Sequence, residues 1–510
     1  MNLAVPTILW LAAGLPVAAP FIRRGRWDIG LFLLPFGGCL ALIAPWIVSA
    51  LAGTSAGGWW WIVEAAVAGA VMGAVAELIL RVGKPRRGKP ASGSLPMTGA
   101  SLPRLSSPVR TLRRVLIPVS LLIVAFVAWS NFTTGLGFCR GYPPYQWDGY
   151  AIWLLRAKML AGASAYPTAV WTGTGHFDYP LVLPALLALF RRFGGLEILG
   201  LSSAIGLNAG VFPLAAWAGM FRRIGGGLAG AVALAPFAMD RLLRLQFAAF
   251  ADPLLTMAGL YGLSLCLIGV RDRDRGYLLA GGLALAVAAA TKNEGVLWVL
   301  CCGPTVGLYV LDTRQGFRKA VGAVLCAVLP AAVFFAAWGA AWRRIGVSND
   351  LVTAWTASLM SVRLGPVLTA VWTELAKPAN LLLLGVGLAG MLALPVVWRA
   401  GNVLMGGSQA VRGGTWGEIL RTGLLCLRRT LVLLSGPALY VAGIVLIYLT
   451  THNPLEWHLR TSLDRVLFLA PPAVLAMMLI ARVGAPGEPA PAPAWATGGE
   501  EAAKHAGGQH

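Results

Sequence analysis

Long runs of apolar residues, separated by short polar segments, dominate the chain. Most runs approach the roughly 20 residues that cross a bilayer as an α-helix. A helix satisfies its backbone hydrogen bonds internally, which makes it the simplest structure able to span lipid. The pattern predicts an all-α fold, a polytopic transmembrane bundle of about 13 spans, at residues 2–20, 29–51, 59–80, 114–131, 196–220, 226–239, 246–270, 276–290, 295–311, 320–341, 379–398, 430–450 and 466–482.

Composition divides this bundle into parts. Residues 1–80 form N-terminal membrane spans, an extension ahead of the main region. Residues 81–113 are basic and rich in Pro, Ser and Gly, which is typical of a flexible cytoplasmic linker. Residues 114–482 contain the remaining spans and most of the unusual polar residues, and residues 483–510 form a low-complexity tail that is expected to be disordered.

Charge orients the chain in the membrane. Of the 510 residues, 57% are hydrophobic and only 12% are charged, which excludes an ordinary soluble enzyme. The net charge of +21 would indicate a nucleic-acid partner in a soluble protein, but here the basic residues lie between apolar runs. If the loop with Arg23, Arg24 and Arg26 is cytoplasmic, 27 of the 41 Lys and Arg residues lie on that side. This bias predicts a multi-pass membrane protein with no nucleic-acid partner.

The first long loop on the opposite, extracytoplasmic side spans residues 132–195. It is expected to form two amphipathic helices that lie in the membrane interface. Aromatic residues of the first helix are expected to anchor it there: Trp147, Tyr150 and Trp153. The polar residues beside the two helices are Asp148, Arg156, Lys158, Asp178 and Tyr179.

Four further outer segments carry ionisable groups at the ends of spans. One contains FADPLLTM with Asp252, the next contains TKNEG, and another is the 343–378 loop. The last is THNPLEWHLRTSLDR. Because ionisable groups at membrane depth are costly and tend to be functional, we expect one site that faces the extracytoplasmic side. Its further candidates are Lys292, Glu294, His458, Arg460 and Arg465.

Acids and bases on the outer face of a membrane suit an anionic lipid substrate. Arg and Lys can hold a lipid phosphate. A carboxylate can act as a general base towards a hydroxyl, or can hold a divalent metal that bridges to phosphate. If a sugar on a polyprenyl phosphate is cleaved at its anomeric carbon, the phosphate leaves, and cationic side chains stabilise its developing charge.

The order of these motifs resembles the GT-C superfamily of membrane glycosyltransferases, which take sugars from polyprenyl-phosphate donors. The most similar branch is bacterial and akin to the dolichyl-phosphate-mannose–protein mannosyltransferases. The resemblance covers roughly residues 114–482 and rests on the order and common outer placement of a few motifs. These are WDGYAIWLLRAKML, DYPLVLPALLALF, FADPLLTM, TKNEG and LEWHLRTSLDR.

The resemblance implies a bacterial inner-membrane enzyme with a periplasmic active site. Asp148 matches the family's catalytic carboxylate, and Asp252 matches a second acid near the donor phosphate or a metal. Lys292, Arg460 and Arg465 match the basic residues that hold the lipid phosphate. The chain lacks the adjacent acids and the Asp-x-Asp pair of some relatives. No metal ligand or cofactor is therefore assigned, and a divalent metal stays an open alternative.

Each candidate also has a structural explanation. Asp148 and Asp252 can cap or start the helices that follow them, and Asp178 can be a turn residue. Lys292 and Glu294 can form a local ion pair. Arg460 and Arg465 can anchor the chain at the interface, and the His452, Glu456 and His458 group is too loose to define a metal site.

The sequence therefore predicts an enzyme that transfers a sugar from a polyprenyl-phosphate-linked donor to an acceptor glycan, lipid or protein, with Asp148 as general base. One alternative is a multi-span transporter or lipid flippase, which would place charges near the bilayer midplane and show inverted repeats. Another is an envelope polymerase or ligase that uses pyrophosphate-linked lipids, whose topology and basic outer loops would be the same.

Overall fold

The computed structural model shows an all-α protein, as the sequence predicts, with no strand among the residues that it describes. The described residues are 4–52, 60–82, 122–123, 125–127, 129–130, 133, 149–162, 179–195, 250–346, 357–385, 388, 416–451 and 453–481.

Eight helices of the described chain are long and apolar enough to cross a membrane. They make the chain a multi-pass membrane protein. Predicted spans 196–220 and 226–239 lie outside the described residues, as do most of 114–131 and of 379–398, so the count of about 13 stays a prediction. The candidate spans are Ala4–Ile22, Trp27–Ala52, Trp61–Arg81, Asp252–Arg271, Asn293–Asp312, Phe317–Ile345, Leu427–Thr450 and Leu455–Met478.

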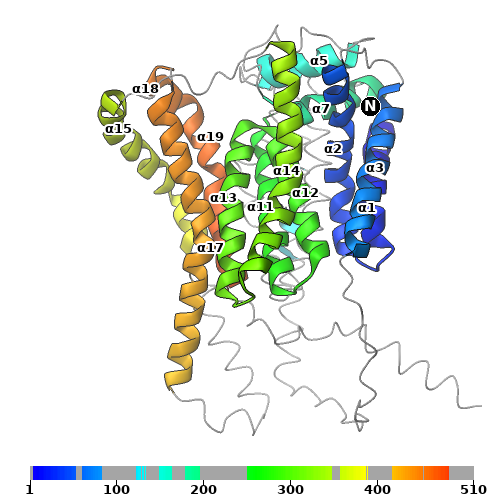
Figure 1. Cartoon of the computed structure of the whole chain (residues 1–510). Coiled ribbons are helices and arrows are strands. Elements are labelled where there is room, and N and C mark those ends of the chain that lie inside the picture. The colour runs from blue at the N-terminus through cyan, green and yellow to red at the C-terminus, as the bar shows by residue number, and fades with distance from the viewer. Residues whose placement is uncertain are drawn as a thin grey trace, which may run out of the picture.

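The N-terminal helices α1 (Ala4–Ile22), α2 (Trp27–Ala52) and α3 (Trp60–Val82) pack together along one side of the bundle (Figure 1). The indole N–H of Trp10 on α1 donates a 2.9 Å hydrogen bond to the Pro35 carbonyl inside α2. This predicted extension also contacts the main region directly, because Phe32 on α2 packs edge-on against Tyr261. The two regions therefore share one core.

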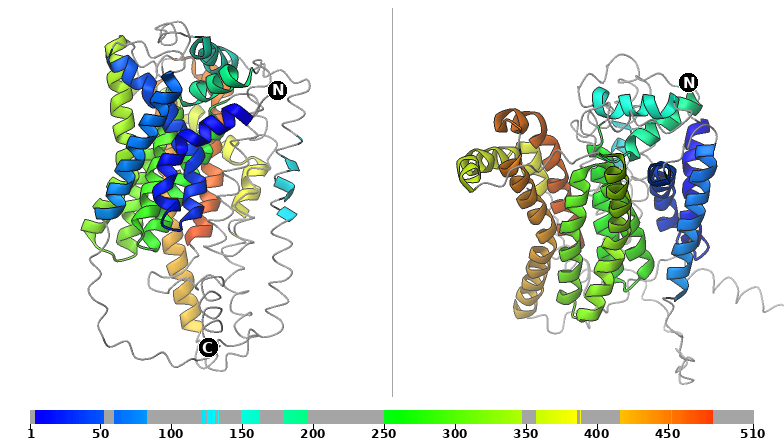
Figure 2. Two further views of the ribbon diagram at one scale, coloured as in Figure 1. Left: turned by 90° about the vertical axis from the view of Figure 1, so that its right-hand side faces the viewer. Right: turned by 45° about the horizontal axis from the view of Figure 1, so that its top comes forward.

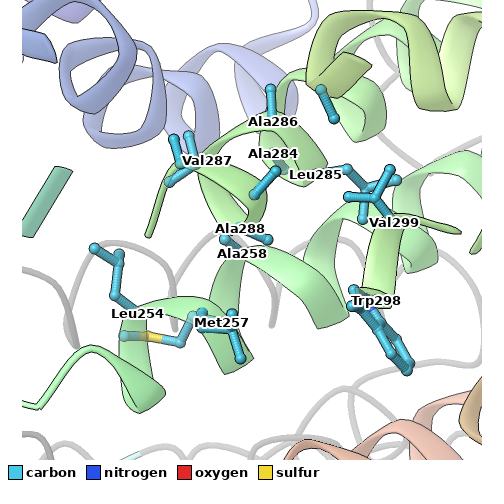
Figure 3. Packing of buried hydrophobic residues seen from close by; sticks show 14 of the residues in the cluster. Leu254, Met257, Ala258, Ala284, Leu285, Ala286, Val287, Ala288, Trp298 and Val299 are labelled. Carbon is cyan, nitrogen blue, oxygen red and sulfur yellow. The ribbon is translucent and has the colours of Figure 1, made fainter. Parts of the chain in front are cut away.

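The centre of the bundle is built from three consecutive helices, α11 (Asp252–Arg271), α12 (Arg275–Thr291) and α13 (Asn293–Asp312). Every residue of α11 from Asp252 to Val270 is buried. Small residues such as Ala258 and Ala288 lie where α11 and α12 approach, and Trp298 of α13 fills space nearby (Figure 3). Small side chains let helix backbones pack closely in membranes.

Two short helices cover one end of the bundle (Figures 1 and 2). A π-helical turn, Gly149–Leu154, leads into α5 (Leu155–Gly162), which packs on α7 (Val182–Gly194). Helices were expected here, but not their burial: Val182 to Phe190 are all buried against α5 and the bundle. The expectation that Trp153 anchors the first helix at the interface is wrong, because its ring is buried and stacks on Tyr179.

The C-terminal part differs from the expected element boundaries. The segment expected as the 343–378 loop contains the helix α15 (Ala357–Leu375), which bends by 63° into Pro378–Gly385. Polar residues such as Arg363 break the apolar run there and conceal the helix in the sequence. Helix α14 (Phe317–Ile345) precedes this segment, and the remaining elements are α17 (Trp416–Thr450), α18 (Leu455–His458), a π-helical turn (Leu459–Leu463), α19 (Asp464–Val466), a 3-10 turn (Leu467–Leu469) and α20 (Ala470–Ala481).

Candidate functional site

A buried cluster of three ionisable side chains lies at the covered end of the bundle. The Lys292 Nζ atom is 3.0 Å from Asp252 Oδ1 and 3.0 Å from Glu294 Oε1. The side chains are only 7%, 3% and 11% exposed, respectively. Burial of charged groups at this level requires pairing, because an isolated buried ion is strongly disfavoured.

Helix ends position all three groups. Lys292 is the single extended residue (φ −160°, ψ 155°) between the end of α12 and the start of α13. Glu294 lies in the first turn of α13 and Asp252 in the first turn of α11. The Pro253 ring is accommodated at the start of α11, where no intrahelical N–H donor is needed. Lys292 also donates a hydrogen bond to Asp252. The ion pair expected between Lys292 and Glu294 is therefore part of a cluster of three ionisable side chains.

The two carboxylates keep Lys292 protonated. Burial, the largest effect, lowers the pKa of Lys292, but the negative charges of Asp252 and Glu294 outweigh it and raise the pKa above its ordinary value. The Arg465 charge opposes this rise. Two carboxylates and one ammonium leave the cluster with an excess negative charge, which Arg465 balances electrostatically.

One oxygen on each carboxylate remains open. Asp252 Oδ2 and Glu294 Oε2 are buried and have no hydrogen-bond partner among the described residues. An unsatisfied buried acceptor costs about 1–3 kcal/mol, more if it is charged. Such oxygens can accept hydrogen bonds from substrate hydroxyls or bind a cation.

The first outer loop reaches the cluster through Tyr179. The Lys292 ammonium lies 5.9 Å from the centre of the Tyr179 ring, within the range of a cation–π contact. Arg156 holds this part of the loop, because it is fully buried and donates a 3.1 Å hydrogen bond to the Tyr179 carbonyl. Arg156 is therefore a positioning residue for Tyr179 here. Lys158 is exposed on the same helix.

The segment before the last predicted span supplies Arg465, the second cation near the cluster after Lys292. The Arg465 guanidinium lies 4.8 Å from the centre of the Phe250 ring, next to the start of α11, and donates to the Thr461 carbonyl. His458 packs against the Tyr448 ring at 4.7 Å between centroids. Arg460 is exposed.

Hydrogen bonds connect the segment before the last span, and also α15, to the end of α17. The Tyr448 hydroxyl and Ser462 Oγ are 2.7 Å apart. Arg363 of α15 donates to the Thr451 carbonyl at the end of α17, which attaches the fourth predicted outer segment. All five predicted outer segments thus have described residues at this end of the bundle.

The structure brings together Asp252, Lys292, Glu294, Tyr179 and Arg465, and it places His458 beside Tyr448. Asp148 and Asp178 lie outside the described residues, as do Trp147 and His452. Sequence reasoning missed Phe250 and Tyr448. Both are part of apolar runs, and nothing in the local sequence separates them from the other aromatic residues of these runs.

No described group of three or more His, Cys, Asp or Glu side chains could hold a metal ion. Asp252 and Glu294 alone offer two carboxylates, and both already neutralise Lys292. The donor set therefore suits a hydrogen-bonding ligand better than a divalent ion, which requires more oxygen ligands.

No family model, curated protein or solved structure matches the chain. The resemblance to the GT-C glycosyltransferases rests on the sequence motifs alone.

Proposed function

We propose that the chain is an integral membrane glycosyltransferase. It transfers a sugar from a polyprenyl-phosphate donor to a hydroxyl of an extracytoplasmic glycan, lipid or protein. The observation that carries the proposal is the buried Lys292 between Asp252 and Glu294, at the bundle end where the predicted outer segments meet. A site of this kind combines acceptors for sugar hydroxyls with cations for a lipid phosphate.

The transfer is a single displacement. The acceptor hydroxyl attacks the anomeric carbon, Asp148 takes the hydroxyl proton, and the bond from the anomeric carbon to the phosphate oxygen breaks. Polyprenyl phosphate leaves with the bonding electrons, and the anomeric configuration inverts. Cations near the leaving oxygen lower the barrier by stabilising its charge.

The described residues have distinct parts in this proposal. The open oxygens of Asp252 and Glu294 accept hydrogen bonds from hydroxyls of the donor sugar. Lys292 pairs with both carboxylates and has one of its three N–H donors left for the phosphate. Arg465 and the exposed Arg460 supply the remaining positive charge.

A transporter or lipid flippase is the alternative. Transporters place their coupling charges near the bilayer midplane, on interrupted helices. Asp252 begins α11 and Lys292 joins two helix ends, which supports a site at one end of the bundle instead. This favours the enzyme over the transporter, and over a flippase for the same reason.

The direct test is sugar transfer by the purified full-length chain. The protein is incubated with radiolabelled polyprenyl-phosphate sugars and membrane extract, and the labelled product is identified. We expect transfer by the wild type and a loss of about 100-fold or more in Asp148→Asn, because general-base catalysis contributes at least this much. Arg344→Gln, exposed at the end of α14, is the control that keeps full activity.

Two results would contradict the proposal. Full activity of Asp148→Asn, with expression and lipid binding unchanged, would show that another group is the base. Movement of a lipid or solute across vesicles containing the protein, without transfer of label from any donor, would establish the transporter instead.

A further inference from the structure

The opposite end of the bundle carries a cluster of basic side chains on two neighbouring turns. One turn joins α11 to α12 and the other joins α13 to α14. The Gln315 side-chain N–H group donates a 2.9 Å hydrogen bond to the Val270 carbonyl, which ties the second turn to the end of α11. We call the exposed basic residues of these turns the basic-turn surface: Arg273, Arg275, Arg314, Arg318 and Lys319.

Every carboxylate of the two turns is already neutralised by another cation. Asp274 pairs with Arg26 and also caps α12, and Asp272 pairs with Arg271. Asp312 is held by Arg428 and Arg429 of α17, with the shorter contact at 2.7 Å. None of the five side chains of the basic-turn surface has an ion pair or hydrogen bond within the described chain. Their charges are therefore available to an external anion.

The backbone conformation of two residues at this surface is unusual for arginine. Arg273 and Arg314 have φ values of 53° and 55°, in the left-handed region. Glycine adopts this region without steric cost, and Asn more readily than Arg. Membrane orientation requires only positive charge near the end of a span, which ordinary helical or extended positions supply. Both left-handed positions are occupied by exposed arginines, which fits a ligand for guanidinium groups at this surface.

The surroundings identify that ligand. Phe317, 73% exposed, stands beside Arg318 at the start of α14, and α14 is a candidate membrane span. An exposed aromatic ring beside cations at a span end is typical of the boundary between acyl chains and headgroups. Guanidinium groups bind phosphate through two parallel hydrogen bonds.

We propose that the basic-turn surface binds the phosphate headgroups of anionic phospholipids in the leaflet opposite the Asp252–Lys292–Glu294 cluster. The site is independent of the proposed sugar transfer, since it lies at the other end of the bundle. It fixes the α11–α12 and α13–α14 turns against the membrane surface.

The test measures binding of short-chain phosphatidylglycerol to the full-length chain in neutral detergent, by native mass spectrometry, with short-chain phosphatidylcholine as the reference lipid. We expect the wild type to prefer phosphatidylglycerol. Arg273→Asn/Arg314→Asn should weaken phosphatidylglycerol binding roughly tenfold or more, because Asn tolerates the left-handed backbone but carries no charge. The control is Arg343→Asn/Arg344→Asn, which removes the same charge at the opposite end of α14 and should keep the preference.

A second variant, Arg318→Gln/Lys319→Gln, removes two charges of the same surface at exposed helical positions. It tests the proposal even if the Arg273→Asn/Arg314→Asn protein does not fold. It should also weaken phosphatidylglycerol binding. Equal binding of both lipids by the wild type, or an unchanged preference in Arg273→Asn/Arg314→Asn and in this variant, would overturn the proposal. Displacement of the lipid by an equal concentration of inorganic phosphate would also overturn it, since the ligand would then be a free anion.

Discussion

Lys292 illustrates how single residues define the site. Its ammonium group is removed from water at a cost of several kcal/mol, and the Asp252 and Glu294 carboxylates offset this cost through direct contact. Three groups that would each be unfavourable alone form a stable set. The set stays chemically open because one oxygen on each acid has no partner in the described chain.

Replacing Lys292 should therefore destabilise the protein strongly. Lys292→Met removes the cation that contacts both buried carboxylates, and we expect the free energy of unfolding to fall by about 3–5 kcal/mol. Thermal denaturation in detergent measures this. The matched control is Lys158→Met, an exposed lysine, for which we expect almost no change. A similar thermal denaturation midpoint for Lys292→Met and Lys158→Met would show that the cluster is not ionised.

The raised pKa of Lys292 gives a pH dependence of defined sign. A group whose pKa is higher in the folded state stabilises the protein fully below its unfolded value, here 10.5, and loses this contribution as pH rises through the folded pKa. We expect the stability difference between wild type and Lys292→Met to stay constant from neutral pH and to decline only above 10.5. A decline that begins near neutral pH would contradict the raised pKa.

At the scale of elements, α5 and α7 are the clearest example of what the sequence predicts and what it does not. The spacing of apolar residues predicts both helices. It does not reveal that Val182 to Phe190 are buried all round, because an amphipathic pattern is the same against lipid and against protein. The sequence makes Arg156 a candidate substrate-binding residue, and only the fold shows that its side chain donates a hydrogen bond to the Tyr179 carbonyl.

Removing Arg156 should loosen the loop around Tyr179. Arg156→Met leaves the Tyr179 carbonyl without this donor, at a cost of about 1–3 kcal/mol. We expect limited proteolysis within residues 132–195 to become roughly tenfold faster. The control is Arg191→Met on α7, whose side chain is partly exposed and has no hydrogen bond in the described chain. Equal cleavage rates for the two variants would contradict the positioning role of Arg156.

The contact between α11 and α12 depends on glycine. A Cβ atom at Gly281 would lie 2.6 Å from the Gly262 carbonyl oxygen and 2.8 Å from the Cys266 backbone nitrogen, so the helices would have to move apart. We expect Gly281→Ala to lower the free energy of unfolding by about 1–3 kcal/mol. At Gly322 of α14 nothing lies within 4 Å of such an atom. Gly322→Ala should raise helix stability slightly, and a similar loss in both variants would contradict the close contact.

For the whole molecule, alternation of loops across the membrane predicts that five segments share one side. The described residues of all five do lie at one end of the bundle, where Tyr179, Asp252, Lys292 and Arg465 converge. The partners themselves are not predictable from the sequence. Lys292 and Asp252 are 40 positions apart, and their pairing depends on how α11, α12 and α13 pack.

The two ends of α14 provide a test of membrane orientation. Arg318 and Arg344 are both exposed, one at each end. We expect Arg344→Cys, in a chain without its native cysteines, to react with a membrane-impermeant maleimide in intact spheroplasts. Arg318→Cys should react only after the membrane is permeabilised. The reverse labelling pattern would show that the positive-inside orientation is wrong and would place the buried cluster on the cytoplasmic side.

The central claim is that the buried cluster belongs to a sugar-transfer site. The most direct measurement is transfer of label from a polyprenyl-phosphate sugar, compared between the wild type, Asp252→Asn and Arg344→Gln. Asp252→Asn keeps the shape of the side chain but removes its charge and one acceptor. We expect transfer by the wild type and Arg344→Gln, and a loss of about 100-fold in Asp252→Asn with the folded protein retained. Undiminished transfer by Asp252→Asn would contradict the claim.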